Sequence, residues 1–147
     1  MSEAVFMIIE IITAVYLTVM SVLDIKYKHI PITPGVVCMG SVFVTELIVG
    51  VNILSVAAGL ITSVLLYLIS RLSKGGIGEA DALVYGVSGV SVGFYKNMEI
   101  LFIALVLSAI AGGFLLAAKK VSRKYRMPFV PFTLAGYMMV VVIWHFL

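Results

Sequence analysis

Hydrophobic residues occur along the chain in six runs, which are separated by short stretches containing charged residues, glycine or proline. Most of these runs approach the length of about 20 apolar residues that a helix needs to cross a lipid bilayer. We therefore predict an all-helical fold, a polytopic membrane protein with a bundle of six transmembrane helices. The predicted helices cover residues 4–23, 33–51, 53–70, 81–95, 99–118 and 129–147.

The fourth run, residues 81–95, is shorter than the others. At about 1.5 Å of rise per residue it does not reach across a hydrocarbon core roughly 30 Å thick. We expect its ends to lie below the membrane surface, or its neighbours to shield it. Gly86, Gly89 and Gly93 in this run predict close packing against other helices.

The overall composition agrees with a membrane protein. The chain has 147 residues, of which 63% are hydrophobic and 12% are charged, whereas a soluble domain has about 25% charged residues. The apolar runs follow one another along the whole chain, so we expect a single domain, residues 1–147. Cys38 is the one cysteine in the sequence, which excludes a disulfide within the chain and a multi-cysteine zinc site.

Basic residues mark one end of the predicted bundle. Nine of the ten Lys and Arg residues follow the first, third and fifth runs, and Lys96 lies on the opposite side. The positive-inside rule makes the basic side cytoplasmic, with both termini outside. We expect a protein of the inner (cell) membrane, whose net charge of +3 reflects contact with anionic lipid headgroups and not with nucleic acid.

Two aspartates lie at helix ends on this cytoplasmic side. Asp24 closes the first predicted helix and Asp81 opens the fourth, so two helices distant in sequence present carboxylates at the same depth. Charge position alone favours ordinary roles, in which Asp24 pairs with Lys28 and Asp81 caps its helix. The glycine-rich stretch "GGIGEAD", residues 75–81, ends in Asp81 and favours a close approach to another helix, because glycine leaves the backbone free to adopt it.

Three segments resemble the motifs of one family, the type IV prepilin peptidases, which are membrane aspartic proteases with a GxGD-type motif and have archaeal preflagellin peptidases as relatives. "DIKYKHIP", residues 24–31, is similar to the first motif, an aspartate followed by a basic stretch and Ile-Pro. "GEAD", residues 78–81, resembles the second motif, with Ala80 where glycine is usual. "MPFVPFTLAG", residues 127–136, is similar to the Pro-Phe-x-Pro-Phe segment that opens the last helix.

The resemblance implies an aspartic endopeptidase with Asp24 and Asp81 as its catalytic residues and with no metal or cofactor. The residues that it implies near the substrate are Pro31, Gly78, Glu79, Ala80, Pro128 and Pro131. The implied partner is a prepilin-like or preflagellin-like precursor, which loses a short basic leader at the cytoplasmic membrane surface. The paired cysteines of the larger bifunctional members are absent, so the resemblance does not imply N-methylating activity.

The sequence leaves several alternatives open. Either aspartate can be the base and the other the acid, and the oligomeric state is not fixed. Glu79 is equally compatible with attracting a basic leader and with stabilising the start of its helix. The alternative functions are a non-catalytic membrane subunit and a small proton-coupled transporter, which would use Glu10 and Asp24 on one face of the first helix.

Overall fold

The computed structural model describes residues 2–74 and 78–147. These residues form six helices, one for each predicted run. The helices are α1 (Ser2–Tyr27), α2 (Ile32–Val49), α3 (Ile53–Leu72), α4 (Glu79–Val92), α5 (Phe94–Ala117) and α6 (Val130–Phe146). Of the predicted glycine-rich stretch, Gly75, Gly76 and Ile77 lie outside the described residues, and Gly78 lies within them.

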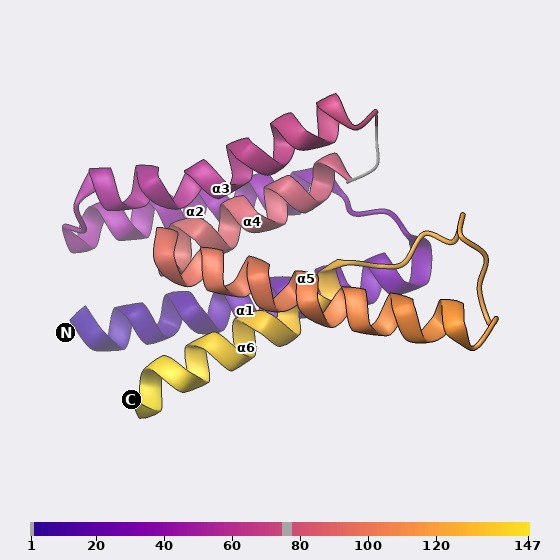
Figure 1. Cartoon of the computed structure of the whole chain (residues 1–147). Coiled ribbons are helices and arrows are strands. Elements are labelled where there is room, and N and C mark those ends of the chain that lie inside the picture. Colours follow the sequence, from indigo (N-terminus) through magenta and orange to yellow (C-terminus); the bar gives the residue numbers. More distant parts are fainter. Residues whose placement is uncertain (1, 75–77) are drawn as a thin grey trace.

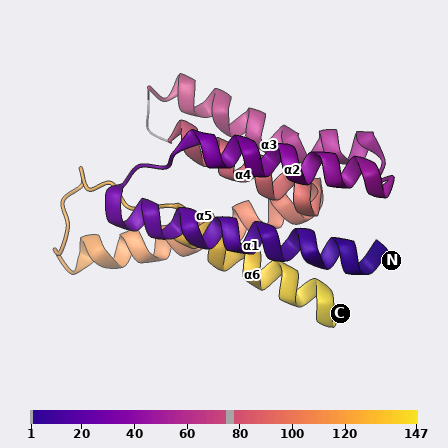
Figure 2. The same ribbon diagram turned by 180° about the vertical axis from the view of Figure 1, so that it is seen from behind.

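The six helices form a bundle in which both termini lie at the same end (Figure 1). Seen from behind, α1 and α2 cover one face, and α6 runs beside α1 (Figure 2). α4 contacts each of the other described helices. The bundle is therefore built around α4, the shortest of the helices described.

The central place of α4 explains how so short a helix is accommodated. Its 14 residues give a length of about 21 Å, less than the thickness of the hydrocarbon core. Nearly all of the helix between Ala82 and Ser91 is buried. The prediction that neighbouring helices shield this segment is confirmed.

Two glycines allow α3 and α4 to touch through their backbones. A Cβ atom added to Gly59 of α3 would collide with the carbonyl oxygen of Gly89 of α4, and a Cβ atom on Gly89 would collide with the carbonyl oxygen of Gly59. Farther along the same contact, the Ser63 hydroxyl donates to the Ala82 carbonyl at 2.6 Å. Close packing at Gly89 is thus confirmed, and its counterpart is Gly59.

The predicted boundary between the fourth and fifth helices is wrong. α4 ends at Val92 and α5 begins at Phe94, whereas the sequence pattern placed these helices at 81–95 and 99–118. Gly93 lies between them with a φ of 81°, a left-handed value that glycine adopts without strain. This residue, predicted to belong to a closely packed helix face, instead ends α4 and turns the chain directly into α5.

Asn97 explains why the start of α5 was missed. The predicted spans left residues 96–98 between two helices, but Asn97 is fully buried. Its amide nitrogen donates to the Tyr85 carbonyl at 3.1 Å, and its amide oxygen accepts from the Ser88 hydroxyl at 2.7 Å. Because α4 satisfies both ends of the amide, a polar residue sits inside the bundle at little cost.

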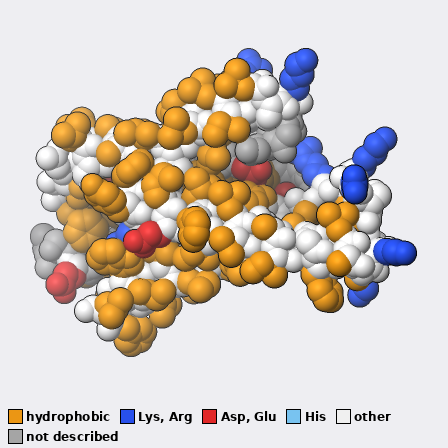
Figure 3. Space-filling view, viewed as in Figure 1, with side chains coloured by type: hydrophobic (Ala, Val, Ile, Leu, Met, Phe, Trp, Pro, Cys, Tyr) orange, Lys and Arg blue, Asp and Glu red, His pale blue; other side chains and the backbone are white. Residues whose placement is uncertain are grey.

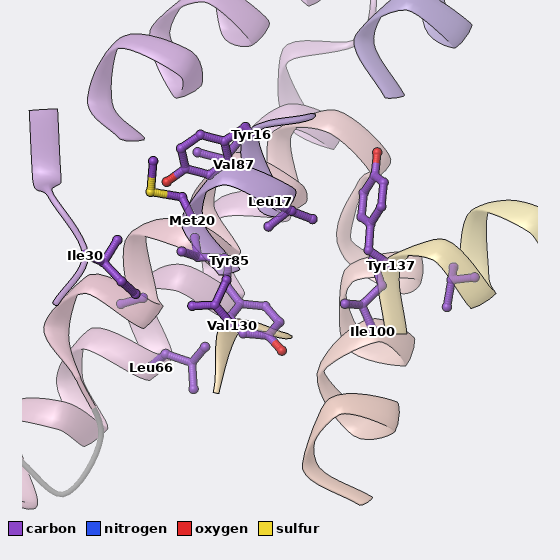
Figure 4. Packing of buried hydrophobic residues seen from close by; sticks show 13 residues of the cluster. Tyr16, Leu17, Met20, Ile30, Leu66, Tyr85, Val87, Ile100, Val130 and Tyr137 are labelled. Carbon is purple, nitrogen blue, oxygen red and sulfur yellow. The ribbon is translucent and has the colours of Figure 1, made fainter. Parts of the chain in front are cut away.

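The largest cluster of buried hydrophobic residues joins α1, α4 and α6 (Figure 4). Tyr16, Leu17, Tyr85 and Tyr137 belong to it. The Tyr85 hydroxyl lies 3.1 Å from the Thr133 hydroxyl, and the Tyr137 hydroxyl donates to the Glu10 carbonyl at 3.1 Å. These contacts fix α6 against the two helices that carry Asp24 and Asp81.

Among the described residues, four helices are long and apolar enough to cross a membrane, and these are α1, α2, α3 and α5. α6 is apolar but shorter. Lys and Arg side chains gather at the end of the bundle away from the termini (Figure 3). The helices thus agree with a membrane protein, and one end of the bundle is strongly basic.

Candidate active site

Asp24 lies in the last turn of α1. The helix continues to Tyr27, beyond its predicted end at residue 23. Asp24 is 8% exposed, and its Oδ2 atom accepts a hydrogen bond from the backbone N–H of Val130, with an N···O distance of 3.1 Å. Phe129, the N-cap residue of α6, supplies no side-chain cap. Asp24 therefore satisfies a backbone donor at the start of α6, and this bond holds its carboxylate between the two helices.

The ion pair between Asp24 and Lys28, the ordinary role considered from charge position, is not found among the described residues. The Lys28 ammonium group lies 4.3 Å from the centre of the Tyr125 ring, in the connection between α5 and α6. The backbone N–H of Lys28 donates to the Asp24 carbonyl at 2.9 Å. The carboxylate of Asp24 thus interacts with α6, and the lysine side chain interacts with the loop before it.

Asp81 lies in the first turn of α4 but is not its N-cap, contrary to the ordinary role considered from charge position. The helix begins at Glu79, and its N-cap is Gly78. The backbone N–H of Asp81 donates to the Gly78 carbonyl at 3.0 Å, and the Asp81 carboxylate accepts a hydrogen bond from the backbone of Gly78. This reciprocal pair resembles a capping box and holds the carboxylate close to Gly78.

A cavity of about 740 Å³ contains both aspartates. Asp24 enters it from α1 and Asp81 from α4, and the charge of Asp24 acts on Asp81 across it. The remaining walls come from α3, α5 and the connections that precede α2 and α6. Two carboxylates far apart in sequence therefore share one hollow toward the basic end of the bundle.

The predicted substrate-proximal residues divide into two groups. Those that line the cavity are Gly78, Glu79, Ala80 and Pro128. Pro31 and Pro131 do not line it. Pro31 is the N-cap residue of α2, and Pro131 is the second residue of α6. Because proline tolerates the first turn of a helix, both residues are suited to these positions at the starts of their helices.

The cavity also holds basic residues that the sequence pattern did not assign to a site. Lys28, His29 and Arg126 line it. The charge of Arg126 acts on Asp81, and a Cβ atom added to Gly78 would lie 3.0 Å from Asp81 Oδ2 and 3.3 Å from Arg126 Nη2. Arg126 directly precedes the Met-Pro-Phe segment, and that position was the available signal.

Glu10 and Glu79 have partners of their own. The Glu10 carboxylate lies 3.8 Å from His145 Nδ1, near the C-terminus of α6, and Glu10 does not line the cavity. The Glu79 carboxylate lies on the rim and makes an exposed ion pair with Arg71 at 3.4 Å. The predicted common face of Glu10 and Asp24 therefore does not give the two acids a common cavity.

Paired carboxylates in one cavity are suited to general acid and base work, because one can hold a proton while the other accepts one. No group of three or more His, Cys, Asp and Glu side chains that could hold a metal ion occurs among the described residues.

The chain was compared with known protein families. Residues 11–117 match the type IV leader peptidase family. The chain belongs to this family. Comparison with curated proteins and with solved structures gave no match. The protein is thus a peptidase, and its long apolar helices make it a membrane peptidase.

The segment of this leader peptidase that matches the family contains both Asp24 and Asp81. It ends before the α5–α6 connection and α6, which supply Arg126 and the Val130 N–H. The place of Arg126 in the cavity and the bond from Val130 to Asp24 therefore rest on the geometry of this chain.

Proposed function

We propose that this leader peptidase is an aspartic endopeptidase in which Asp24 and Asp81 form the catalytic pair. The observation that carries the proposal is that both carboxylates line one cavity, although they come from the first and fourth helices. Each is held by a backbone group, Asp24 by Val130 and Asp81 by Gly78. Such fixed side chains lose little freedom when a peptide bond is brought between them.

The pair would act on a water molecule and a peptide carbonyl. Two adjacent carboxylates do not ionise together easily, so they share one proton. The ionised carboxylate accepts a proton from water as the water oxygen bonds to the carbonyl carbon, and the protonated carboxyl group donates its proton to the carbonyl oxygen. The C–N bond then breaks as the protonated carboxyl group donates a proton to the departing amine and the ionised carboxylate accepts one from a hydroxyl of the tetrahedral intermediate, so the pair again holds one proton.

The proposed substrate is a prepilin-like precursor with a short basic leader ahead of an apolar helix, as membership of the leader peptidase family supports. We assign the reaction to the cytoplasmic face of the cell membrane, because the basic residues that follow α1, α3 and α5 favour that side. Glu79 is a candidate contact for the leader. Its ion pair with Arg71 is exposed, and such pairs are weak enough for a basic peptide to compete.

The test is coexpression of the protein with an epitope-tagged precursor in a host that lacks its own leader peptidase, with cleavage followed as a mobility shift. We expect cleavage by the wild-type protein and none by Asp24→Asn or Asp81→Asn. Glu3→Gln is the matched control, because it makes the same kind of acid-to-amide change in α1 at the exposed N-terminal end. Wild-type cleavage by either aspartate variant, in protein that remains folded in detergent, would remove the proposal.

A further inference from the structure

The middle of α3 meets the start of α5, and the two helices separate toward the basic end of the bundle (Figure 1). Near the α4–α5 turn the Thr62 hydroxyl of α3 lies 3.4 Å from the Met98 sulfur of α5. From there the two helices diverge toward the basic end, as both views of the ribbon show (Figures 1 and 2). The start of α4 lies between them, so the diverging helices form the sides of the cavity that contains Asp81.

The two sides of this cleft are apolar except at Ser108. α3 contributes Leu66 and Ile69, and α5 contributes Leu101, Leu105 and Ser108. The spacing of three and four residues places each set on one face of its helix. Ile69 is 46% exposed and Leu105 is 51% exposed, so the cleft is open on its outer side.

Acidic side chains are visible at the bottom of a hollow between α3 and α5 when the bundle is viewed from its side (Figure 3). Hydrophobic side chains border this hollow, and basic side chains lie beyond it at the end of the bundle. The cavity is therefore open on the side of the bundle, which is the side that faces lipid in a membrane. Near the basic end of the bundle, polar groups line the cavity.

We propose that the cleft between α3 and α5 is a lateral entrance, through which the apolar helix of a precursor reaches the aspartate pair from the bilayer. This inference rests on the proposed function. A cleavage site next to an apolar helix must reach Asp24 and Asp81 while that helix stays in lipid, and an opening on the side of the bundle permits this.

The chemistry of the walls selects this occupant over the basic leader. The described wall residues from α3 and α5 include no charged side chain, whereas Lys28, His29 and Arg126 lie near the other wall. A cationic leader gains nothing from the apolar sides. The α5 side, from Leu101 to Ser108, extends for about 10 Å at the rise of a helix, which is two turns of a bound helical segment.

Reversible blocking of the cleft tests the inference. In a Cys38→Ser background, which leaves no other thiol, Leu105→Cys is labelled with a bulky methanethiosulfonate reagent and then reduced. Ile110→Cys is the matched control, because Ile110 is 65% exposed on the opposite face of the same helix. We expect labelling of Leu105→Cys to slow precursor cleavage by about tenfold or more, a difference of about 1.4 kcal/mol. Reduction should restore the rate, and labelling of Ile110→Cys should change it less than about twofold.

Each outcome bears on a separate claim. If the wild-type protein does not cleave, or if cleavage survives Asp24→Asn, the proposed function fails. If cleavage depends on both aspartates but labelling at positions 105 and 110 has the same effect, the entrance lies elsewhere and the inference is overturned. Because labelled and reduced samples are the same protein, a folding defect does not mimic the expected result.

A trapped complex gives a second measurement. A photo-crosslinking amino acid at position 105, in an Asp81→Asn background that cannot cleave, should form an adduct with the apolar helix of the precursor. The same amino acid at position 110 should form adducts with lipid. Lipid adducts alone at position 105 would overturn the inference.

Discussion

Gly78→Ala provides a direct probe of the Asp81 carboxylate. Gly78 has φ and ψ of −67° and 134°, a backbone conformation open to any residue, so alanine introduces no backbone strain. The added Cβ atom would lie 3.0 Å from Asp81 Oδ2 and 3.3 Å from Arg126 Nη2. The substitution therefore acts on the site through contact with these two side chains.

The size of the effect follows from the distance. Ordinary contact with a Cβ atom begins at 3.4 Å, so the carboxylate oxygen must move by about 0.4 Å. A misplacement of about 1 Å at a reacting group costs about 100-fold in rate. On that scale we expect kcat to fall roughly sixfold, which corresponds to about 1 kcal/mol. The loss of helix stability from replacing the N-cap glycine should stay below about 1 kcal/mol.

The assay is the rate of leader removal from a purified precursor in detergent, with thermal unfolding measured on the same sample. Gly40→Ala is the control, since a Cβ atom at Gly40 of α2 meets no atom within 4 Å. Gly40→Ala should cleave at the wild-type rate. A wild-type rate for Gly78→Ala, with unfolding unchanged, would refute the idea that the position of Asp81 beside Gly78 controls the reaction.

Three further predictions test the pair and its support. The cleavage rate should be bell-shaped in pH, because a fully protonated pair has no base and a fully ionised pair has no acid; a flat profile from acidic to alkaline pH would contradict this. Gly89→Ala should prevent normal packing, because the new methyl group meets the Gly59 carbonyl, and yields of folded protein in detergent should fall, whereas Gly40→Ala should leave them unchanged. Asn97→Ala should lower stability by about 1–3 kcal/mol, since the Tyr85 carbonyl loses a buried donor; an unaltered thermal midpoint would oppose this.

The pattern of hydrophobic runs predicted the number of helices, because an apolar stretch of bilayer length can be recognised without knowing how the helices pack. It misplaced the α4–α5 boundary because a polar residue such as Asn97 has the same appearance in sequence whether it is exposed or held by Tyr85 and Ser88. Only the packing of α5 on α4 distinguishes the two cases. Likewise, the sequence does not distinguish a glycine that makes a close helix contact from one that, like Gly93, adopts a positive φ.

The candidate site was predictable in part for the same kind of reason. Asp24 and Asp81 were chosen as candidates because carboxylates are rare in such an apolar chain and because both lie in segments that resemble family motifs. The cleft walls were not found, because Leu105 and Ile110 are equally apolar and lie close together in sequence. Leu105 lines the cavity, whereas Ile110 lies on the far side of α5. This difference depends on the position of α3 beside α5.

The cavity itself follows from unequal helix lengths. α4 has 14 residues, whereas α3 has 20 and α5 has 24, which gives lengths of about 21, 30 and 36 Å. α5 continues directly from α4 at Gly93, and α3 is fixed to α4 where Gly59 meets Gly89, which leaves 13 residues of α3 but only 10 of α4 on the basic side of that contact. The N-terminus of α4 therefore stops short of the ends of its neighbours. A first-turn residue such as Asp81 is left recessed between two longer apolar helices, and the proposed entry of a peptide from lipid requires a recess of this kind.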